Sequence, residues 1–125
     1  MATTKTQKGE RTLYTVDAAG GSLGRVASEA ASILLGKKSA QYMQNEVVAA
    51  EVEIINASKL VMTEKRIAGK EYTRYTGYPG GLRITSLSNL LQKKGVSEAL
   101  WKAVDGMIPR NKLRKERMKR LTITD

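Results

Sequence analysis

Residues 13–36 contain the pattern that most restricts how this chain folds. A short β-prone run at 13–16 ends in the turn signal Asp-Ala-Ala-Gly-Gly at 17–21. Ser22 then precedes apolar residues spaced at i, i+3, i+4, i+7, i+8 and i+11, namely Leu23, Val26, Ala27, Ala30, Ala31 and Leu34. This spacing predicts an amphipathic helix capped by Ser22 and stopped at Gly36. Strand, turn and helix together predict the opening of a βαβ unit.

The next segments continue the α/β pattern. Residues 47–57 predict the second strand, and Asn56-Ala57-Ser58 ends it. The apolar run at 60–62 predicts a further strand or a single buried turn, and the polar segment 63–71 predicts an exposed loop.

Two helices are predicted after residue 85. Ser86 caps the first, which carries Leu87, Leu90 and Leu91 and stops at Gly95. Ser97 caps the second, whose apolar stripe consists of Leu100, Val104, Met107 and Ile108 and which ends at Pro109. Val96 and Trp101 are spaced as a hydrophobic staple, which predicts that Trp101 is a core residue.

Composition limits the possible functions. The chain has 125 residues, enough for one domain, and 22 Lys and Arg against 12 Asp and Glu, a net charge of +10. Such a charge predicts a polyanionic partner. The absence of Cys and His removes thiolate nucleophiles, the commonest general base and the commonest metal ligands, so catalysis is disfavoured. No apolar run reaches membrane-spanning length, and residues 1–11 predict a flexible arm without a signal-peptide core.

The glycine-containing turn at 20–25 is a weak candidate for a nucleotide site. Glycines between a strand and a helix N-terminus bind phosphates in many enzymes. Here the spacing fits neither the dinucleotide motif nor the P-loop. A glycine that allows close helix–strand packing is the favoured interpretation, and contact between Arg25 and a nucleic-acid phosphate stays open.

Residues 72–83, Tyr-Thr-Arg-Tyr-Thr-Gly-Tyr-Pro-Gly-Gly-Leu-Arg, hold three of the five tyrosines. Their glycines and proline predict a shaped loop rather than a helix or strand. Tyrosine faces stack on unpaired bases and guanidinium groups hold phosphates, so an RNA-contact loop competes with a turn that covers the core. The basic residues just upstream favour the RNA interpretation.

Residues 110–120 carry seven basic side chains and one acid. Like charges repel along a helix, so we expect order mainly with phosphates bound and a frayed, solvated tail otherwise. The candidate RNA-binding residues of the chain are therefore Arg25, Lys37, Lys38, Lys65, Arg66, Lys70, Tyr72, Arg74, Tyr75, Tyr78, Gly80, Gly81, Arg83, Arg110, Lys112, Arg114, Lys115, Arg117, Lys119 and Arg120.

Several of these stretches resemble one known family. They are Val16-Asp17-Ala18, Leu23 to Ala27, Gly36-Lys37-Lys38 with Tyr42, Ile54 to Lys59, Tyr72 to Leu82, and Gly106 to Leu113. In order and spacing they are similar to the L-thirteen family of large-subunit ribosomal proteins, in its bacterial form. The Thr76 to Gly81 block and the Gly-Met-Ile-Pro block at 106–109 are the most specific.

The resemblance implies one domain with three layers, α/β/α, on a small, mostly parallel four-stranded sheet, followed by a basic C-terminal helix or tail. It implies a structural constituent of the large subunit that binds large-subunit ribosomal RNA beside neighbouring ribosomal proteins and supports early assembly. No catalysis, cofactor, metal, membrane, small-molecule substrate or homo-oligomer is expected. The expected location is the ribosome of the cytoplasm or of an organelle. A free-standing RNA-binding regulator and a small nucleotide-binding α/β enzyme are the alternatives.

The sequence also departs from the family pattern. Tyr75 stands where the family usually has His, and residues 44–50 lack the usual proline, glycine and aspartates. Arg114 replaces a usual glycine, and Glu116 and Arg117 are atypical, which makes the predicted helix more basic. The chain stops at Asp125 without the family's usual extension, so we expect RNA contacts of that extension to be absent or supplied by a neighbour.

Overall fold

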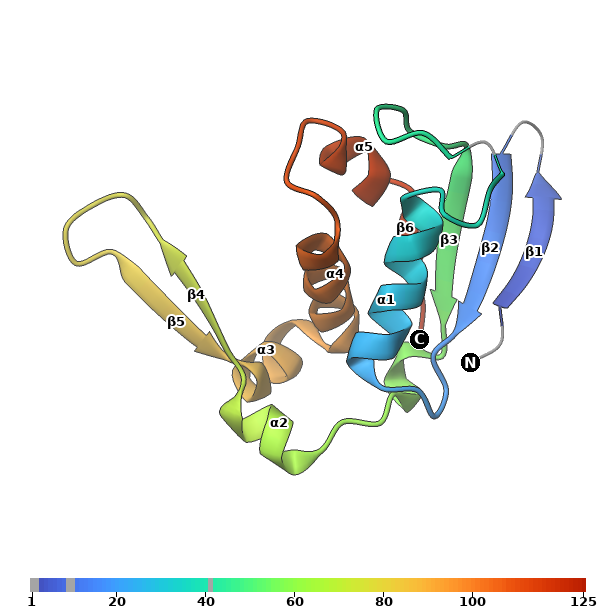
Figure 1. Cartoon of the computed structure of the whole chain (residues 1–125). Coiled ribbons are helices and arrows are strands. Elements are labelled where there is room, and N and C mark those ends of the chain that lie inside the picture. Colours follow the sequence, from blue (N-terminus) through green and yellow to red (C-terminus); the bar gives the residue numbers. More distant parts are fainter. Residues whose placement is uncertain (1–2, 9–10, 41) are drawn as a thin grey trace.

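The computed structural model describes residues 3–8, 11–40 and 42–125 (Figure 1). The strands are β1 (Thr3–Lys8), β2 (Arg11–Asp17), β3 (Ala50–Ile55), β4 (Glu71–Tyr75), β5 (Leu82–Ser86) and β6 (Leu121–Ile123). The α-helices are α1 (Leu23–Leu34), α2 (Glu64–Gly69), α3 (Leu87–Lys94), α4 (Val96–Met107) and α5 (Arg114–Met118), and η1 (Ala57–Lys59) is a 3-10 turn. None of the described helices is long and apolar enough to cross a membrane.

The main sheet has four strands in the order β1-β2-β3-β6. β1 pairs antiparallel with β2, whereas β2–β3 and β3–β6 are parallel. The predicted βαβ unit is therefore confirmed as β2-α1-β3, within a mostly parallel four-stranded sheet. Thr3–Lys8 was expected to belong to a flexible arm and instead forms β1, because its backbone pairs with β2 from Thr3↔Val16 to Lys8↔Arg11.

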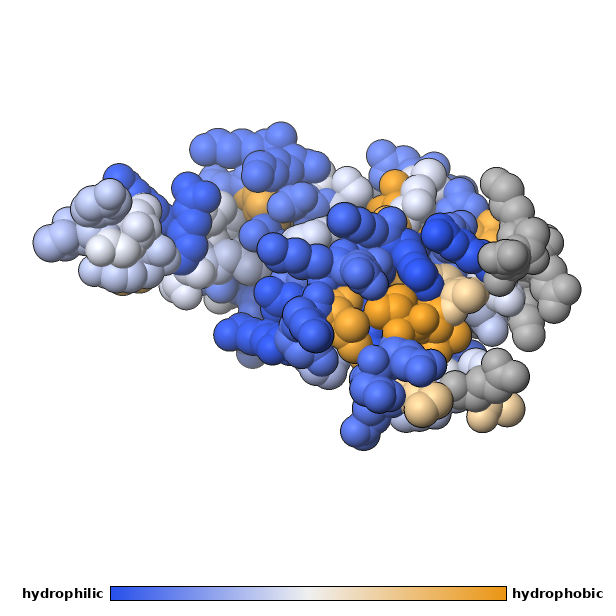
Figure 2. All heavy atoms as spheres, turned by 90° about the horizontal axis from the view of Figure 1, so that it is seen from above, coloured by the Kyte–Doolittle hydropathy of each residue, from blue (hydrophilic) through white to orange (hydrophobic). Residues whose placement is uncertain are grey.

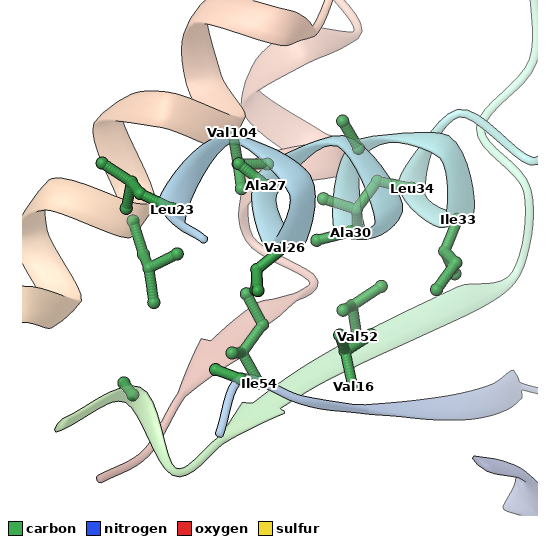
Figure 3. Packing of buried hydrophobic residues seen from close by; sticks show 14 of the residues in the cluster. Val16, Leu23, Val26, Ala27, Ala30, Ile33, Leu34, Val52, Ile54 and Val104 are labelled. Carbon is green, nitrogen blue, oxygen red and sulfur yellow. The ribbon is translucent and has the colours of Figure 1, made fainter. Parts of the chain in front are cut away.

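The core lies between α1 and one face of this sheet. Burial alternates along β3, so Val52 and Ile54 point toward α1 together with Val16 of β2 (Figure 3). Val26 projects from α1 toward these side chains, and Val104 of α4 lies beside Ala27. Each fully buried valine or isoleucine contributes about 1.5–3 kcal/mol relative to exposure. The predicted stripe of α1 is thus the face that the helix buries.

Only one face of the sheet carries helices in the described part of the chain. Leu121 and Ile123 pair with Val52 and Ile54, so their side chains share the core face, and α4 lies against them. The other face alternates with polar residues, among them Thr15, Glu51, Glu53 and Thr122, none of which joins the core. Strands with one polar face are half-buried rather than covered on both sides, so the described residues show helices on one face of the sheet, and the three-layer arrangement stays a prediction.

The start of α3 agrees with the prediction from the sequence, and the start of α4 does not. Ser86 caps α3, because its hydroxyl accepts from the Asn89 N–H at 3.4 Å. α4 begins at Val96, with Gly95 at its N-cap in a positive φ of 81°, so the predicted cap at Ser97 and the staple are wrong. Trp101 is 40% exposed instead of forming part of the core. Its side chain lies at the surface, beside Met118 of α5 and Leu121 of β6.

Residues 63–71, predicted as a loop, contain helix α2. Thr63 caps it, since its hydroxyl accepts from the Arg66 N–H at 3.4 Å. This short helix buries none of its residues fully, and its sequence has no apolar stripe that would have predicted a helix. The preceding run at 60–62 is neither a regular strand nor a buried turn: Val61 forms one isolated bridge with Ser22 and is exposed.

Candidate nucleic-acid interface

The stretch 72–83 forms most of a β-hairpin that projects away from the main sheet (Figure 1). β4 and β5 pair antiparallel from Glu71↔Ser86 to Tyr75↔Leu82, and residues 76–81 connect them. The expectation of a loop that resists strand structure is wrong on both sides of the connection. Tyrosine, threonine and isoleucine favour strands, and the glycines and proline are confined to the tip.

Glycine is required at the tip for two different reasons. Gly77 and Gly80 have positive φ values of 89° and 73°, a region that residues with a Cβ avoid. Gly81 is crowded instead, because a Cβ there would lie 1.8 Å from the Thr76 hydroxyl oxygen and 2.8 Å from the Tyr78 carbonyl oxygen. Gly81 also closes the tip, since its N–H donates to the Tyr78 carbonyl at 2.9 Å.

The two faces of the hairpin differ in chemistry. Directly paired residues share a face, so Arg74 and Arg83 lie side by side, with Tyr72 and Thr85 next to them. Tyr75 lies on the opposite face with Leu82 and Ile84, all exposed. The Tyr75 and Tyr78 side chains are 64% and 76% exposed, as surfaces for base stacking must be. The hairpin therefore has one cationic face, and its other face is apolar near the tip and polar at the base, where Glu71 and Ser86 pair.

Tyr72 differs from the other two tyrosines of the hairpin. Its ring is partly buried and packs against the hydrophobic core. The ammonium groups of Lys70 and Lys102 lie 5.5 Å and 5.6 Å from its centroid, within cation–π range. Burial raises the pKa of the Tyr72 phenol above its ordinary value. Tyr72 therefore packs at the hairpin base beside two lysines, and its contact with RNA stays a prediction.

The basic C-terminal segment is folded onto the domain. Arg117 is 2% exposed, and its Nη2 donates to the carbonyl oxygens of Gln44 and Glu46 at 3.5 Å and 3.3 Å. Arg120 donates through Nη1 to the Val48 carbonyl oxygen. Arg114 Nε lies 3.4 Å from Asp105 Oδ1. These arginines therefore bind the 44–48 segment and α4, so the prediction of a frayed tail is wrong. Because Arg117 is buried, it is unavailable to RNA.

The remaining candidate cations lie on the surface. Lys65 and Arg66 are exposed on α2, Arg25 on α1, and Arg110, Lys112, Lys115 and Lys119 in the C-terminal segment. Lys37 and Lys38 are both exposed, and Lys38 Nζ lies 3.1 Å from Glu29 Oε1. Seen from the side that Figure 2 presents, hydrophilic residues cover most of the surface around a smaller hydrophobic patch. The structure thus spreads the cations over several elements rather than one stripe.

The turn at 17–25 does not favour an anion. Asp17 Oδ1 accepts from Asn56 Nδ2 at 3.0 Å and from the Ala19 N–H at 2.9 Å. These bonds, in that order, lower the pKa of the Asp17 carboxyl and keep it negative. A Cβ on Gly20 or Gly24 would meet no atom within 4 Å, so the expected close packing is wrong for both. Gly20 serves the turn through its positive φ of 72°.

Sequence reasoning passed over three lysines near the hairpin. Lys93 and Lys94 end α3, and Lys102 lies on α4, yet all three border the base of β4 and β5. Two adjacent lysines were the only local signal, and such pairs occur on many helix ends. In the described part of the chain, no group of three or more His, Cys, Asp and Glu residues is placed to hold a metal.

The fold and this surface together define a class, the small basic α/β proteins that carry a projecting cationic hairpin. Comparison with known families is more specific. Residues 11–124 match the family model described as ribosomal protein L13. The chain belongs to this family, as its sequence motifs predicted.

Curated relatives support the same assignment. The chain is 44% identical over 114 residues to the large ribosomal subunit protein uL13 of Moorella thermoacetica, an alignment that covers 91% of this chain and 78% of the relative. It is 40% identical over 126 residues to uL13 of Geobacter sulfurreducens, covering 98% and 87%. The protein of the same name from Desulfitobacterium hafniense is 46% identical over 104 residues, covering 83% and 72%.

Proposed function

We propose that this protein is a structural constituent of the large ribosomal subunit, that it binds large-subunit ribosomal RNA, and that it supports early subunit assembly. The observation that supports the proposal best is the family match across residues 11–124. The names of the similar proteins, which refer to the large ribosomal subunit, support it as well. The net charge of +10 suits a partner with a phosphate backbone. It acts as a structural protein rather than an enzyme, in the ribosome of the cytoplasm, among neighbouring large-subunit proteins and as a single copy.

The hairpin and the exposed cations form the proposed RNA surface. Arg74 and Arg83 offer guanidinium groups to phosphates, and the Tyr75 and Tyr78 rings are available to bases. Exposed basic residues on α1, α2 and the C-terminal segment add phosphate contacts. Gly81, Arg117 and Arg120 support this surface through contacts within the fold, and Tyr72 packs at the base of the hairpin.

Sucrose-gradient fractionation of cells that carry a tagged copy tests the proposal. The protein should co-sediment with large subunits and with their precursors, and it should stay there when the tag is moved to the other terminus. Recovery only in the soluble fraction at low salt contradicts the proposal. Co-sedimentation with messenger RNA but not with large subunits supports the free-standing regulator instead.

A further inference from the structure

The base of the hairpin, α3 and α4 together enclose a cleft of about 270 Å³. Its cations come from three elements that are separate in the sequence. Arg74 belongs to β4, Lys93 and Lys94 lie in the last turn of α3, and Lys102 lies on α4. Tyr72 lines the same cleft, and its ring lies beside the Lys102 ammonium group. Folding therefore gathers four positive charges around one tyrosine.

Among the described residues, none forms an ion pair with these four cations. None of the residues that line the cleft is acidic. The ion pairs of the described residues join Arg11 to Glu51, Lys38 to Glu29 and Arg114 to Asp105, and none involves a cleft residue. Arg74 also lies directly opposite Arg83, and like charges in such a pair destabilise a hairpin. An anion in the cleft relieves this repulsion.

We propose that this cleft binds the phosphodiester backbone of RNA through Lys93, Lys94, Lys102 and Arg74. The proposal rests on the RNA-binding function above and adds three lysines of α3 and α4 to the cations of the hairpin and the basic C-terminal segment. The cleft is continuous with the Arg74 and Arg83 face of the hairpin, so the cations form a track rather than a single point. A track suits a polymer of phosphates better than one free anion.

Matched single-charge variants test the proposal in a binding assay. The probe is a large-subunit ribosomal RNA transcript, with a shuffled transcript of equal length beside it. Lys102→Gln and Lys93→Gln remove cleft charges, and Lys59→Gln is the control, because Lys59 is exposed on η1 and does not line the cleft. Each cleft variant should flatten the dependence of log affinity on log salt by about one unit, which is about tenfold in affinity at ~0.1 M salt. The control should bind like the wild type.

The outcomes separate the two proposals. A wild-type protein that does not prefer the ribosomal transcript overturns the function and the cleft together. A wild type that prefers it, with cleft variants that match Lys59→Gln, overturns the cleft alone. Equal melting temperatures show that the variants remain folded.

Lysine acetylation of the wild-type protein gives a readout that needs no variant. RNA should protect Lys93, Lys94 and Lys102 from the reagent and leave Lys59 reactive. Equal reactivity of all four lysines in the complex overturns the cleft. Equal protection by inorganic phosphate, at the same concentration of phosphate groups, also overturns the proposal, because the cleft would then be a site for free anions.

Discussion

Asn56 and Asp17 join the ends of two parallel strands through their side chains. Asp17 ends β2 and is paired with Ile55, and Asn56 follows at once with a φ of 57°. Asn56 is the only residue other than glycine with positive φ in the described chain. Asparagine tolerates this conformation, and its amide donates to Asp17 at 3.0 Å. One residue thus serves both the turn into η1 and the contact between strands.

Replacing Asn56 tests the two contributions separately. Asn56→Ala should lower the free energy of unfolding by about 2 kcal/mol, because it adds left-handed strain and removes the hydrogen bond. Asn56→Gly keeps the backbone conformation and should cost about 1 kcal/mol. Urea unfolding measures both. Equal losses for the two variants would show that backbone conformation is not limiting at this position.

Asp17 should make stability depend on pH in the acid range. Its folded pKa lies below the ordinary value of 3.8, mainly because of the Asn56 amide, then the Ala19 N–H and the charge of Lys59. A depressed carboxyl pKa stabilises the fold above the unfolded value, and this contribution is lost as pH falls through the folded pKa. Asp17→Asn should therefore be less stable than the wild type at neutral pH, with the gap closing at pH values below 3.8. A gap of constant size in pH-dependent urea titrations would contradict this.

At the scale of elements, the hairpin projects from the domain and, among the described residues, packs against it only at its base. A two-stranded hairpin is marginal alone, so its stability depends on packing at the Tyr72 end. The tip makes no contribution to the core cluster. Changes at the tip and at the base should therefore have separate effects on binding and on stability.

The three tyrosines of the hairpin provide that comparison. Tyr75→Ala and Tyr78→Ala should each reduce affinity for the cognate RNA by about 1–3 kcal/mol for a stacked base and leave the melting temperature nearly unchanged. Tyr72→Ala should lower the melting temperature, because its ring is partly buried. Melting and binding are measured on the same three proteins. Tip variants with normal affinity and a lower melting temperature would make those tyrosines packing residues.

Helix α5 fastens the segment before β3 through a buried guanidinium. Arg117→Ala should cost about 1.5–3 kcal/mol of stability, since it leaves the Gln44 and Glu46 carbonyl oxygens without a charged donor. Lys115→Ala, exposed on the same helix, should change the free energy of unfolding by less than about 0.5 kcal/mol. Unchanged stability with weaker RNA binding would return Arg117 to the RNA-binding set.

At the scale of the whole molecule, the number of cations that contact phosphates governs binding to RNA of any sequence. Lys115→Ala combined with Lys119→Ala removes two exposed cations while keeping Arg117 in place. The double variant should weaken binding to all RNAs and reduce the salt slope by roughly one unit per lost phosphate contact. The ratio of affinities for the ribosomal and shuffled transcripts should stay constant. An unchanged slope would show that α5 does not reach the RNA.

Local patterns were sufficient for part of this molecule. The spacing of apolar residues from Leu23 to Leu34 predicted α1 and its buried face, and the apolar residues within 47–57 predicted the strand that the structure shows as β3. Ser86 predicted the start of α3, and short motifs predicted the family. These features depend on residues within a few positions of one another, or on motif identity, and both can be read along a chain.

Tertiary structure decided where charge and aromatic groups lie. Arg117 resembles its exposed basic neighbours in the sequence, but it donates to carbonyl groups 71 and 73 residues away. Trp101 lies at the surface beside α5 and β6, which follow it in the chain, and residues 72–75 form a strand because 82–85 pair with them. Lys93, Lys94 and Lys102 meet Arg74 only after α3 and α4 pack at the hairpin base. Such groupings depend on partners distant in sequence, and local propensity carries no information about those partners.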